Sequence, residues 1–149
     1  MLATIWHKKG PDWILESNPP LAMGTLFTVN GSSAENVYAV GTFDVLRSDG
    51  TTWEKQDISL TNGVNGVACT SAEEAIIVGF GGSKQRLVAG VWIDDFVEEP
   101  HADLHAAWAD GAGAYWAVGG NFAAPMSSGA SRQGLVARYG AGRVSSTLK

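Results

Sequence analysis

Short apolar runs separated by small polar residues recur along the chain. Three of these runs end in the dipeptide Val-Gly: Asn36–Gly41, Glu74–Gly79 and Ala114–Gly119. Gly, Asn, Asp and Ser, which favour turns, separate them from their neighbours. Short apolar runs with such boundaries are typical of β-strands. Because no segment of about ten or more residues combines a helical period with helix caps, the pattern predicts few helices.

The Val-Gly dipeptides recur at nearly constant intervals. Their glycines lie 38 and then 40 residues apart, and each dipeptide run has one apolar run before it and two after it. The predicted strands are Thr25–Val29, Asn36–Gly41, Asp44–Arg47 and Thr52–Gln56 in the first unit; Val64–Cys69, Glu74–Gly79, Leu87–Ile93 and Phe96–Glu99 in the second; and Leu104–Trp108, Ala114–Gly119, Leu135–Tyr139 and Arg143–Ser146 in the third. A period of about 40 residues with four strands is typical of one blade of a β-propeller. The sequence therefore predicts an all-β, β-propeller fold.

The N-terminal residues supply half of a further unit. Trp13 and Trp53 lie 40 residues apart, and each follows a turn glycine by three positions. Thr4–His7 and Asp12–Glu16 then correspond to the outer two strands of a blade. We expect a partial propeller over residues 1–149, with a half blade at 3–18 and three four-stranded blades at 22–60, 61–100 and 101–149. Because propellers close with roughly four to eight blades, we expect an incomplete ring or one closed by a further copy.

The composition excludes several classes of protein. Of the 149 residues, 45% are hydrophobic and 17% are charged, which argues against disorder. The net charge of −5 argues against a nucleic-acid partner. The single cysteine, Cys69, excludes an internal disulfide framework and a Cys-rich zinc site.

The sequence also contains no recognisable targeting segment. No apolar run approaches the roughly 18 residues of a membrane-spanning helix, and the N-terminus does not resemble a secretory signal. We therefore expect no membrane insertion. The compartment stays open, with an extracellular or cell-envelope location expected if the chain is part of a longer secreted protein.

Two motifs resemble those of known propeller families. Ser48-Asp-Gly-Thr-Thr-Trp53 resembles a shortened Asp-box turn of bacterial sialidase-type repeats, without the spacers between Ser and Asp and between Asp and Gly. Tyr115-Trp-Ala-Val-Gly-Gly120 resembles part of a kelch blade. The Asp-box resemblance implies that Asp49, Gly50 and Trp53 form a structural turn on the outer rim, away from any catalytic centre.

Candidate binding residues lie in loops that we expect on one face of the propeller. The loops between the second and third strands lengthen from Thr42-Phe43 through Phe80–Arg86 to Gly120–Gly134. Rigid sheets often carry binding residues on such loops, although long surface loops are also tolerated at little cost in stability. The candidate binding residues are Lys84, Arg86, His101, Asn121, Phe122 and Arg132.

No set of residues forms a recognisable catalytic motif. His101 and His105 could share a metal ion on a helix, but a loop leading into a strand gives them no reason to converge. We therefore expect no metal site and no cofactor. A sialidase needs an arginine cluster to bind the substrate carboxylate. We interpret the arginines as lying at non-equivalent positions of their units: Arg47, Arg86, Arg132, Arg138 and Arg143.

Two hypotheses about function follow. The first is a non-catalytic recognition or scaffold propeller segment that binds protein or glycan through its loop-rich face. The alternative is a fragment of a sialidase-like or other glycoside hydrolase propeller, so enzymatic activity stays open but is less favoured. A homo-oligomer, or missing blades supplied by further chain, is compatible with either hypothesis.

Overall fold

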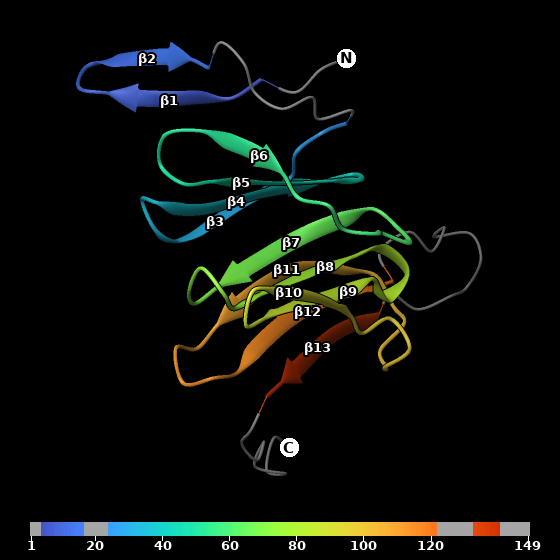
Figure 1. Cartoon of the computed structure of the whole chain (residues 1–149). Helices are drawn as coiled ribbons and strands as arrows, with labels where there is room; N and C mark the ends of the chain where they lie inside the picture. Colours follow the sequence, from blue (N-terminus) through green and yellow to red (C-terminus); the bar gives the residue numbers. More distant parts are fainter. Residues whose placement is uncertain (1–3, 17–23, 122–132, 141–149) are drawn as a thin grey trace, which may run out of the picture.

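The computed structural model describes residues 4–16, 24–121 and 133–140, and its strands form four antiparallel sheets (Figure 1). The N-terminal hairpin consists of β1 (Trp6–Lys9) and β2 (Asp12–Leu15). Blade 1 consists of β3 (Thr28–Ser33), β4 (Asn36–Gly41), β5 (Asp44–Ser48) and β6 (Trp53–Lys55). Blade 2 consists of β7 (Val64–Cys69), β8 (Ala75–Gly79), β9 (Lys84–Val88) and β10 (Val91–Asp94). Blade 3 consists of β11 (Leu104–Ala109), β12 (Tyr115–Asn121) and β13 (Gln133–Tyr139).

The all-β prediction with four-stranded antiparallel blades is confirmed. In blades 1 and 2 the strands pair in chain order, so that the second strand lies between the first and the third. The expected fourth strand of the third unit, Arg143–Ser146, lies outside the described residues. Among the described residues, no helix is long and apolar enough to cross a membrane.

The recurring Val-Gly dipeptide has a steric cause. A Cβ atom at Gly41 would lie 1.9 Å from the carbonyl oxygen of Thr25, and one at Gly79 would lie 2.1 Å from that of Gly63. At Gly119 the corresponding distance, to the carbonyl oxygen of Asp103, is 1.9 Å. In each blade the chain that enters the first strand therefore crosses the end of the second strand where only glycine leaves room.

The core lies between successive blades. Alternate residues of each central strand point to opposite faces of its sheet. Tyr38 and Val40 of β4 pack against blade 2, in a cluster that includes Val67 and Ile77. On the opposite face of blade 2, Ile76 and Val78 pack against Leu104 and Ala117 of blade 3. Blade 2 is thus covered on both faces.

The predicted outer strands of blade 2 are wrong. The sequence pattern placed one strand over Leu87–Ile93 and a turn at Asp94-Asp95, but β9 ends at Val88 and β10 begins at Val91. Ala89 and Gly90 form a two-residue turn with φ angles of 49° and 78°. Two positive φ angles in sequence are those of a type I′ hairpin turn. Because alanine occupies the first of these positions, the turn was hidden inside an apolar run.

The boundary of the loop before β9 also differs from the prediction. The segment Phe80–Arg86 was expected to be a loop, whereas a single 3₁₀ turn, η1 (Phe80–Gly82), and Ser83 connect β8 to β9. Lys84 and Arg86 are therefore strand residues. In blade 3, β12 continues to Asn121 and β13 begins at Gln133, so that the strands extend into both ends of the expected loop. The remainder of that loop, with Phe122 and Arg132, lies outside the described residues.

Candidate functional site

An arginine occupies the same register position in each of the three blades. Arg47 lies opposite Tyr38, Arg86 opposite Ile76 and Arg138 opposite Trp116 in the pairing of second and third strands. Tyr38, Ile76 and Trp116 each follow the first residue of the Val-Gly runs by two positions, so these places are equivalent. The interpretation that these arginines lie at non-equivalent positions is therefore wrong for these three. Arg47 lies on the face of blade 1 that packs against blade 2, and Arg86 lies on the face of blade 2 that packs against blade 3, so these two do not converge on one substrate.

Arg86 connects blade 2 to blade 3. Its guanidinium donates hydrogen bonds to both carboxylate oxygens of Asp95, the residue after β10, and the bond from Nη2 to Oδ1 measures 3.1 Å. The guanidinium carbon also lies 4.2 Å from the ring centre of Tyr139 in β13. Both side chains of the ion pair are mostly buried. The hydrogen bond with Asp95 raises the pKa of Arg86, so Arg86 is a charged structural link between the blades.

Lys84 is buried at a position where the other blades carry valine. Its Nζ donates to the carbonyl oxygens of Gly82 at 2.9 Å, Glu98 at 2.6 Å and Pro100 at 2.8 Å. All three ammonium protons are therefore used, and the residue is 9% exposed. Burial lowers the pKa of Lys84. The lysine thus binds the connection between β10 and β11, which contains a cis Glu99–Pro100 peptide bond, to the start of β9.

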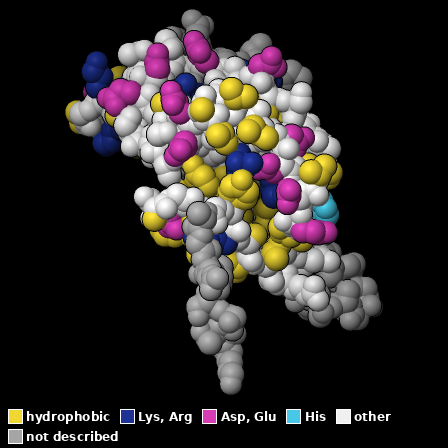
Figure 2. Space-filling model, turned by 60° about the horizontal axis from the view of Figure 1, so that its bottom comes forward, with side chains coloured by type: hydrophobic (Ala, Val, Ile, Leu, Met, Phe, Trp, Pro, Cys, Tyr) yellow, Lys and Arg dark blue, Asp and Glu magenta, His cyan; other side chains and the backbone are white. Residues whose placement is uncertain are grey.

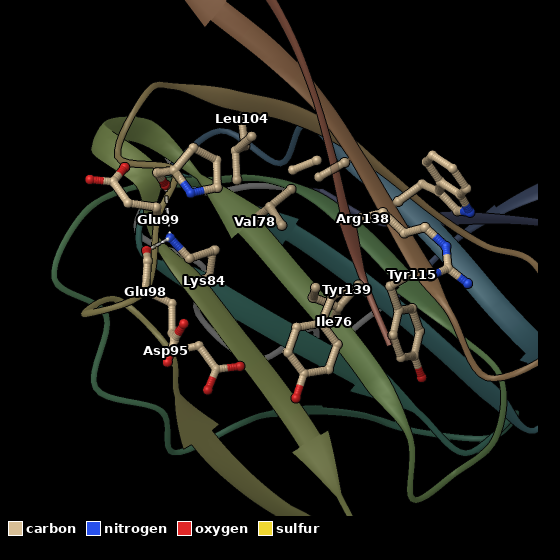
Figure 3. A pocket seen from close by; sticks show the side chains of 14 residues that line it. Ile76, Val78, Lys84, Asp95, Glu98, Glu99, Leu104, Tyr115, Arg138 and Tyr139 are labelled. Carbon is tan, nitrogen blue, oxygen red and sulfur yellow. Dashed lines mark hydrogen bonds between the residues drawn. The ribbon is translucent and has the colours of Figure 1, made fainter. Parts of the chain in front are cut away.

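A groove lies between blades 2 and 3 (Figure 3). It has a volume of about 200 Å³. Its apolar lining comes from both blades and consists of Ile76, Val78, Leu104, Ala117 and Ala137. Figure 3 shows Lys84, Asp95, Glu98 and Glu99 at one end, and Tyr115 and Arg138 at the other. An apolar floor with charged ends suits a ligand that carries both apolar and charged groups.

Carboxylates dominate the accessible part of the first end. Asp95 forms an ion pair with Arg86. The ammonium group of Lys84 is enclosed by the three carbonyl groups to which it donates hydrogen bonds. The carboxylate of Glu98 accepts no hydrogen bond in the described part of the chain, and the residue is exposed. The Glu99 side chain is 82% exposed. A ligand that enters from solvent therefore meets negative charge at this end.

The other predicted binding residues lie away from the groove lining. The His101 ring packs near Phe96, with 5.5 Å between ring centres, and its backbone N–H donates to the Glu99 carboxylate. Asn121 is the exposed last residue of β12, opposite Gln133. The structure therefore places Lys84 in the groove lining and Arg86 against Asp95 and Tyr139, which line the groove. His101 lies beside Glu99 of the acidic end, and Asn121 lies at a separate strand end. Their role in binding stays a prediction.

His101 and His105 have different surroundings. The His105 ring packs edge-on against Phe80 at 6.0 Å between ring centres, and its Nδ1 lies 3.5 Å from Nδ2 of Asn65. Within residues 4–16, 24–121 and 133–140, no group of three or more His, Cys, Asp or Glu side chains is placed to bind a metal ion.

Asp49 organises the turn between β5 and β6. Its Oδ1 accepts hydrogen bonds from the backbone N–H groups of Thr51 and Thr52, both at 2.8 Å, and from the Thr51 hydroxyl. These bonds to the charged form lower the pKa of Asp49. Gly50 has a φ angle of 91° and Trp53 begins β6. The Asp-box and kelch resemblances themselves stay predictions.

One face of the molecule mixes apolar and charged side chains. In Figure 2, hydrophobic side chains gather in a band, and Lys, Arg, Asp and Glu side chains lie among them. The exposed large apolar residues of blade 3 are Trp108, Val118, Val136 and Tyr139.

The successive four-stranded antiparallel sheets, packed face to face, define a β-propeller. A solved structure of YCF48 bound to D1 peptide is similar in fold, with a TM-score of 0.55 and 19% sequence identity, and that protein is a β-propeller. The match covers 66% of this chain but 35% of that one, so this chain corresponds to about a third of the neighbour's length. No protein-family model matches the chain, and no curated protein is significantly similar to it in sequence.

Sequence reasoning missed the acidic end and the aromatic end of the groove. Glu98 and Glu99 were assigned to a strand, and Tyr139 to a strand with no functional role. The available signal was an arginine in each third strand, one residue before the residue that pairs with Val37, Ala75 or Tyr115.

Proposed function

We propose that this protein is a non-catalytic recognition propeller that binds a segment of another protein in the groove between blades 2 and 3. The observation that carries this proposal is the combination of an apolar floor, formed by Ile76, Val78 and Ala117, with the accessible carboxylates of Glu98 and Glu99. An apolar side chain next to a lysine or arginine has the complementary chemistry.

The similarity to YCF48 supports a polypeptide ligand over a glycan. That β-propeller was solved with a peptide bound to it. The two folds correspond over part of their lengths, which makes a peptide ligand a reasonable expectation for this chain without specifying its sequence. The groove residues of this chain determine the specificity that we propose. The bound peptide should be apolar at its centre and basic at the end that meets Glu98 and Glu99.

Fluorescence polarisation tests this proposal. The probes are two pools of labelled nine-residue peptides with a central Leu or Phe, one flanked by Lys and Arg and the other by Glu. We expect the basic pool to bind more tightly, with an affinity that falls as salt increases. Glu98→Lys should weaken binding of the basic pool by about tenfold, because the substitution replaces attraction with repulsion. Ala137→Leu, which narrows the groove, should weaken binding of any peptide that fills it.

Glu73→Lys is the matched control. Glu73 is an exposed carboxylate in the turn between β7 and β8, and it does not line the groove. The two charge reversals change the net charge equally, so Glu73→Lys should leave the affinity for the basic pool within about twofold. Equal binding of both pools, or equal losses in the two variants, would contradict the proposed site. Hydrolysis of aryl glycosides by the purified protein would contradict the non-catalytic assignment.

A further inference from the structure

A buried positive charge lies at a position of blade 2 where blade 1 has an apolar residue. Lys84 pairs with Val78 in blade 2, as Val45 pairs with Val40 in blade 1. Both Lys84 and Val45 are buried. Burying an ammonium group is unfavourable unless hydrogen bonds compensate for the lost water, so valine would satisfy the packing more simply. The lysine therefore indicates a role beyond the packing of the blade.

The connections that follow blades 1 and 2 begin in the same way. The backbone N–H of Gln56 donates to the carbonyl oxygen of Val45 after blade 1, at 2.8 Å. The backbone N–H of Asp95 donates to the carbonyl oxygen of Lys84 after blade 2, at 3.1 Å. The two connections can therefore be compared residue by residue from this point.

The next part of each connection is held differently. In blade 1 the connection packs inward, because Ile58 and Leu60 contact the apolar cluster that contains Val45. The residues at the same distance along the chain in blade 2 are Val97, which is 86% exposed, and Glu99, whose side chain is 82% exposed. Apolar contacts hold the first connection, so polar contacts must hold the second.

The acidic loop, residues 95–103, is bound to blade 2 at both ends. At its start, Asp95 forms an ion pair with Arg86 of β9. At its end, Oδ1 of Asp103 accepts a hydrogen bond from the backbone N–H of Gly81 in η1, at 2.7 Å. These contacts fix where the loop leaves and rejoins the stack of blades, but neither involves the middle of the loop.

Lys84 binds the middle of the acidic loop. Its Nζ donates to the carbonyl oxygens of Glu98 at 2.6 Å and Pro100 at 2.8 Å, on either side of Glu99. Figure 3 shows the Lys84 side chain directed at this stretch of the loop. Because both bonds go to the backbone, the carboxylates of Glu98 and Glu99 stay available at the acidic end of the groove.

We infer that Lys84 is a positioning residue, which holds the acidic loop so that Glu98 and Glu99 face the groove and thereby sets its preference for basic peptide segments. This role rests on the proposed function and identifies what determines its charge specificity. Since Nζ donates to three backbone carbonyl groups, Lys84 acts through the loop and not on the peptide.

Lys84→Met tests this role through the sign of its effect. The substitution keeps most of the side-chain volume and removes a positive charge from the acidic end. By charge alone, it should strengthen binding of the basic peptide pool. If Lys84 positions the loop, the ratio of the affinities for the basic and acidic pools should instead fall by about fivefold, measured by fluorescence polarisation.

Gln85→Met is the matched control. Gln85 is the next residue of β9 and is also buried, and its Nε2 donates to the carbonyl oxygen of Ser59 at 2.9 Å. The control therefore also removes a hydrogen bond between β9 and a connection, but on the opposite face of the strand. The ratio of affinities should stay within about twofold of that of the unmodified protein.

Hydrogen–deuterium exchange without peptide shows whether the loop is released. The backbone N–H of Glu98 donates to the carbonyl oxygen of Asp95 at 3.0 Å. We expect amides in residues 96–101 to exchange at least about tenfold faster in Lys84→Met and at an unchanged rate in Gln85→Met. Unchanged exchange in both variants would overturn the role of Lys84.

A chemical rescue keeps the test decisive if the uncharged variants are unstable. Propylammonium replaces the atoms that Lys84→Ala removes, and it can enter from the groove, which Lys84 lines. We expect propylammonium chloride to raise the Tm of Lys84→Ala and to slow exchange over residues 96–101. Sodium chloride at the same ionic strength should do neither, and an equal rescue by sodium chloride would overturn the inference.

The binding measurements separate the role of Lys84 from the proposed function. A ratio of affinities that is unchanged or higher in Lys84→Met would overturn the role and leave the binding groove in place. Equal falls in Lys84→Met and Gln85→Met would also overturn it, because a general loss of stability would then explain both. Equal binding of the two pools by the unmodified protein would contradict the proposed function, and the role of Lys84 with it.

Discussion

Single glycines decide whether strands can cross in this fold. Gly79 ends β8 where the carbonyl of Gly63 passes, and a Cβ there would approach that oxygen to 2.1 Å. Gly79→Ala must therefore push apart two backbone segments that lie in the centre of the stack. We expect the substitution to lower the free energy of unfolding by at least about 3 kcal/mol, measured by urea denaturation.

Gly134→Ala provides the matched control for this prediction. Gly134 also lies in a strand, β13, but a Cβ there meets no atom within 4 Å. We expect this substitution to change the free energy of unfolding by no more than about 0.5 kcal/mol. Equal effects of the two substitutions would show that glycine is retained in the Val-Gly dipeptides for a reason other than the crossing of the strands.

At the scale of a residue, the sequence predicts the positions that recur in every blade. It does not predict the contacts of a residue that occurs in one blade alone. The Val-Gly dipeptides marked the three central strands because the same steric constraint recurs in every blade. Lys84 could not be understood from the repeat, since its equivalents are valines and its partners are three carbonyl groups. Those carbonyls belong to segments up to 16 residues away along the chain, and no local pattern connects them.

At the scale of an element, the turns differ in how clearly the sequence predicts them. The turn between β5 and β6 contains Asp49 and Gly50, and the flanking strands were predicted within about two residues. The turn between β9 and β10 has the same function but contains Ala89 and Gly90. Because alanine rarely adopts a positive φ angle, the apolar pattern favoured one long strand, and both outer strands of blade 2 were misplaced.

The Asp49 turn should make the stability of the protein depend on acid pH. Its hydrogen bonds lower the pKa of Asp49 in the folded state below the ordinary value of 3.8. A carboxyl group with a lowered folded pKa stabilises the fold above its unfolded pKa, and this contribution is lost as the pH falls through the folded pKa. Asp49→Ala should therefore lower the Tm at pH 7, and the difference from the unmodified protein should narrow below about pH 3.

Thermal melts of three proteins at several pH values would check this prediction. Asp57→Ala is the control, since Asp57 is exposed and its carboxylate accepts no hydrogen bond among the described residues. We expect that control to follow the unmodified protein at every pH. A difference between Asp49→Ala and the unmodified protein that stays constant from pH 7 to about pH 2.5 would assign the role of Asp49 to something other than its charge.

At the scale of the whole molecule, the repeat predicts the stack of blades but not the sites between them. The groove between blades 2 and 3 depends on which residues of two sheets face each other. To predict which residues face each other, one must know the register of β9 and β13. The predicted start of β9 was wrong. The N-terminal hairpin was closer to prediction, because Trp13 and Trp53 follow a turn glycine at the same spacing. The exposure of Val29, 64% against 1% for Val67 of the next blade, became evident only in the structure.

The stack should also unfold unevenly. Repeat proteins gain stability mainly from contacts between neighbouring units. Blade 2 has a neighbour on both faces, whereas every residue of β1 and β2 is exposed. Blade 3 is intermediate: Val118 is 46% exposed, although its equivalents Val40 and Val78 are buried. We expect amides of β7 and β8 to exchange at least about 100-fold more slowly than those of β1 and β2, with β11 and β12 between them.

Native-state hydrogen exchange across a series of urea concentrations measures this order directly. Amides of β7 and β8 should exchange only through opening that is as sensitive to urea as global unfolding. Those of β1 and β2 should exchange through opening that is nearly independent of urea, because the hairpin exposes little additional surface when it separates. A single exchange free energy for all four sheets would mean that the chain folds as one cooperative unit. The hairpin would then unfold together with blade 1 and the rest of the stack.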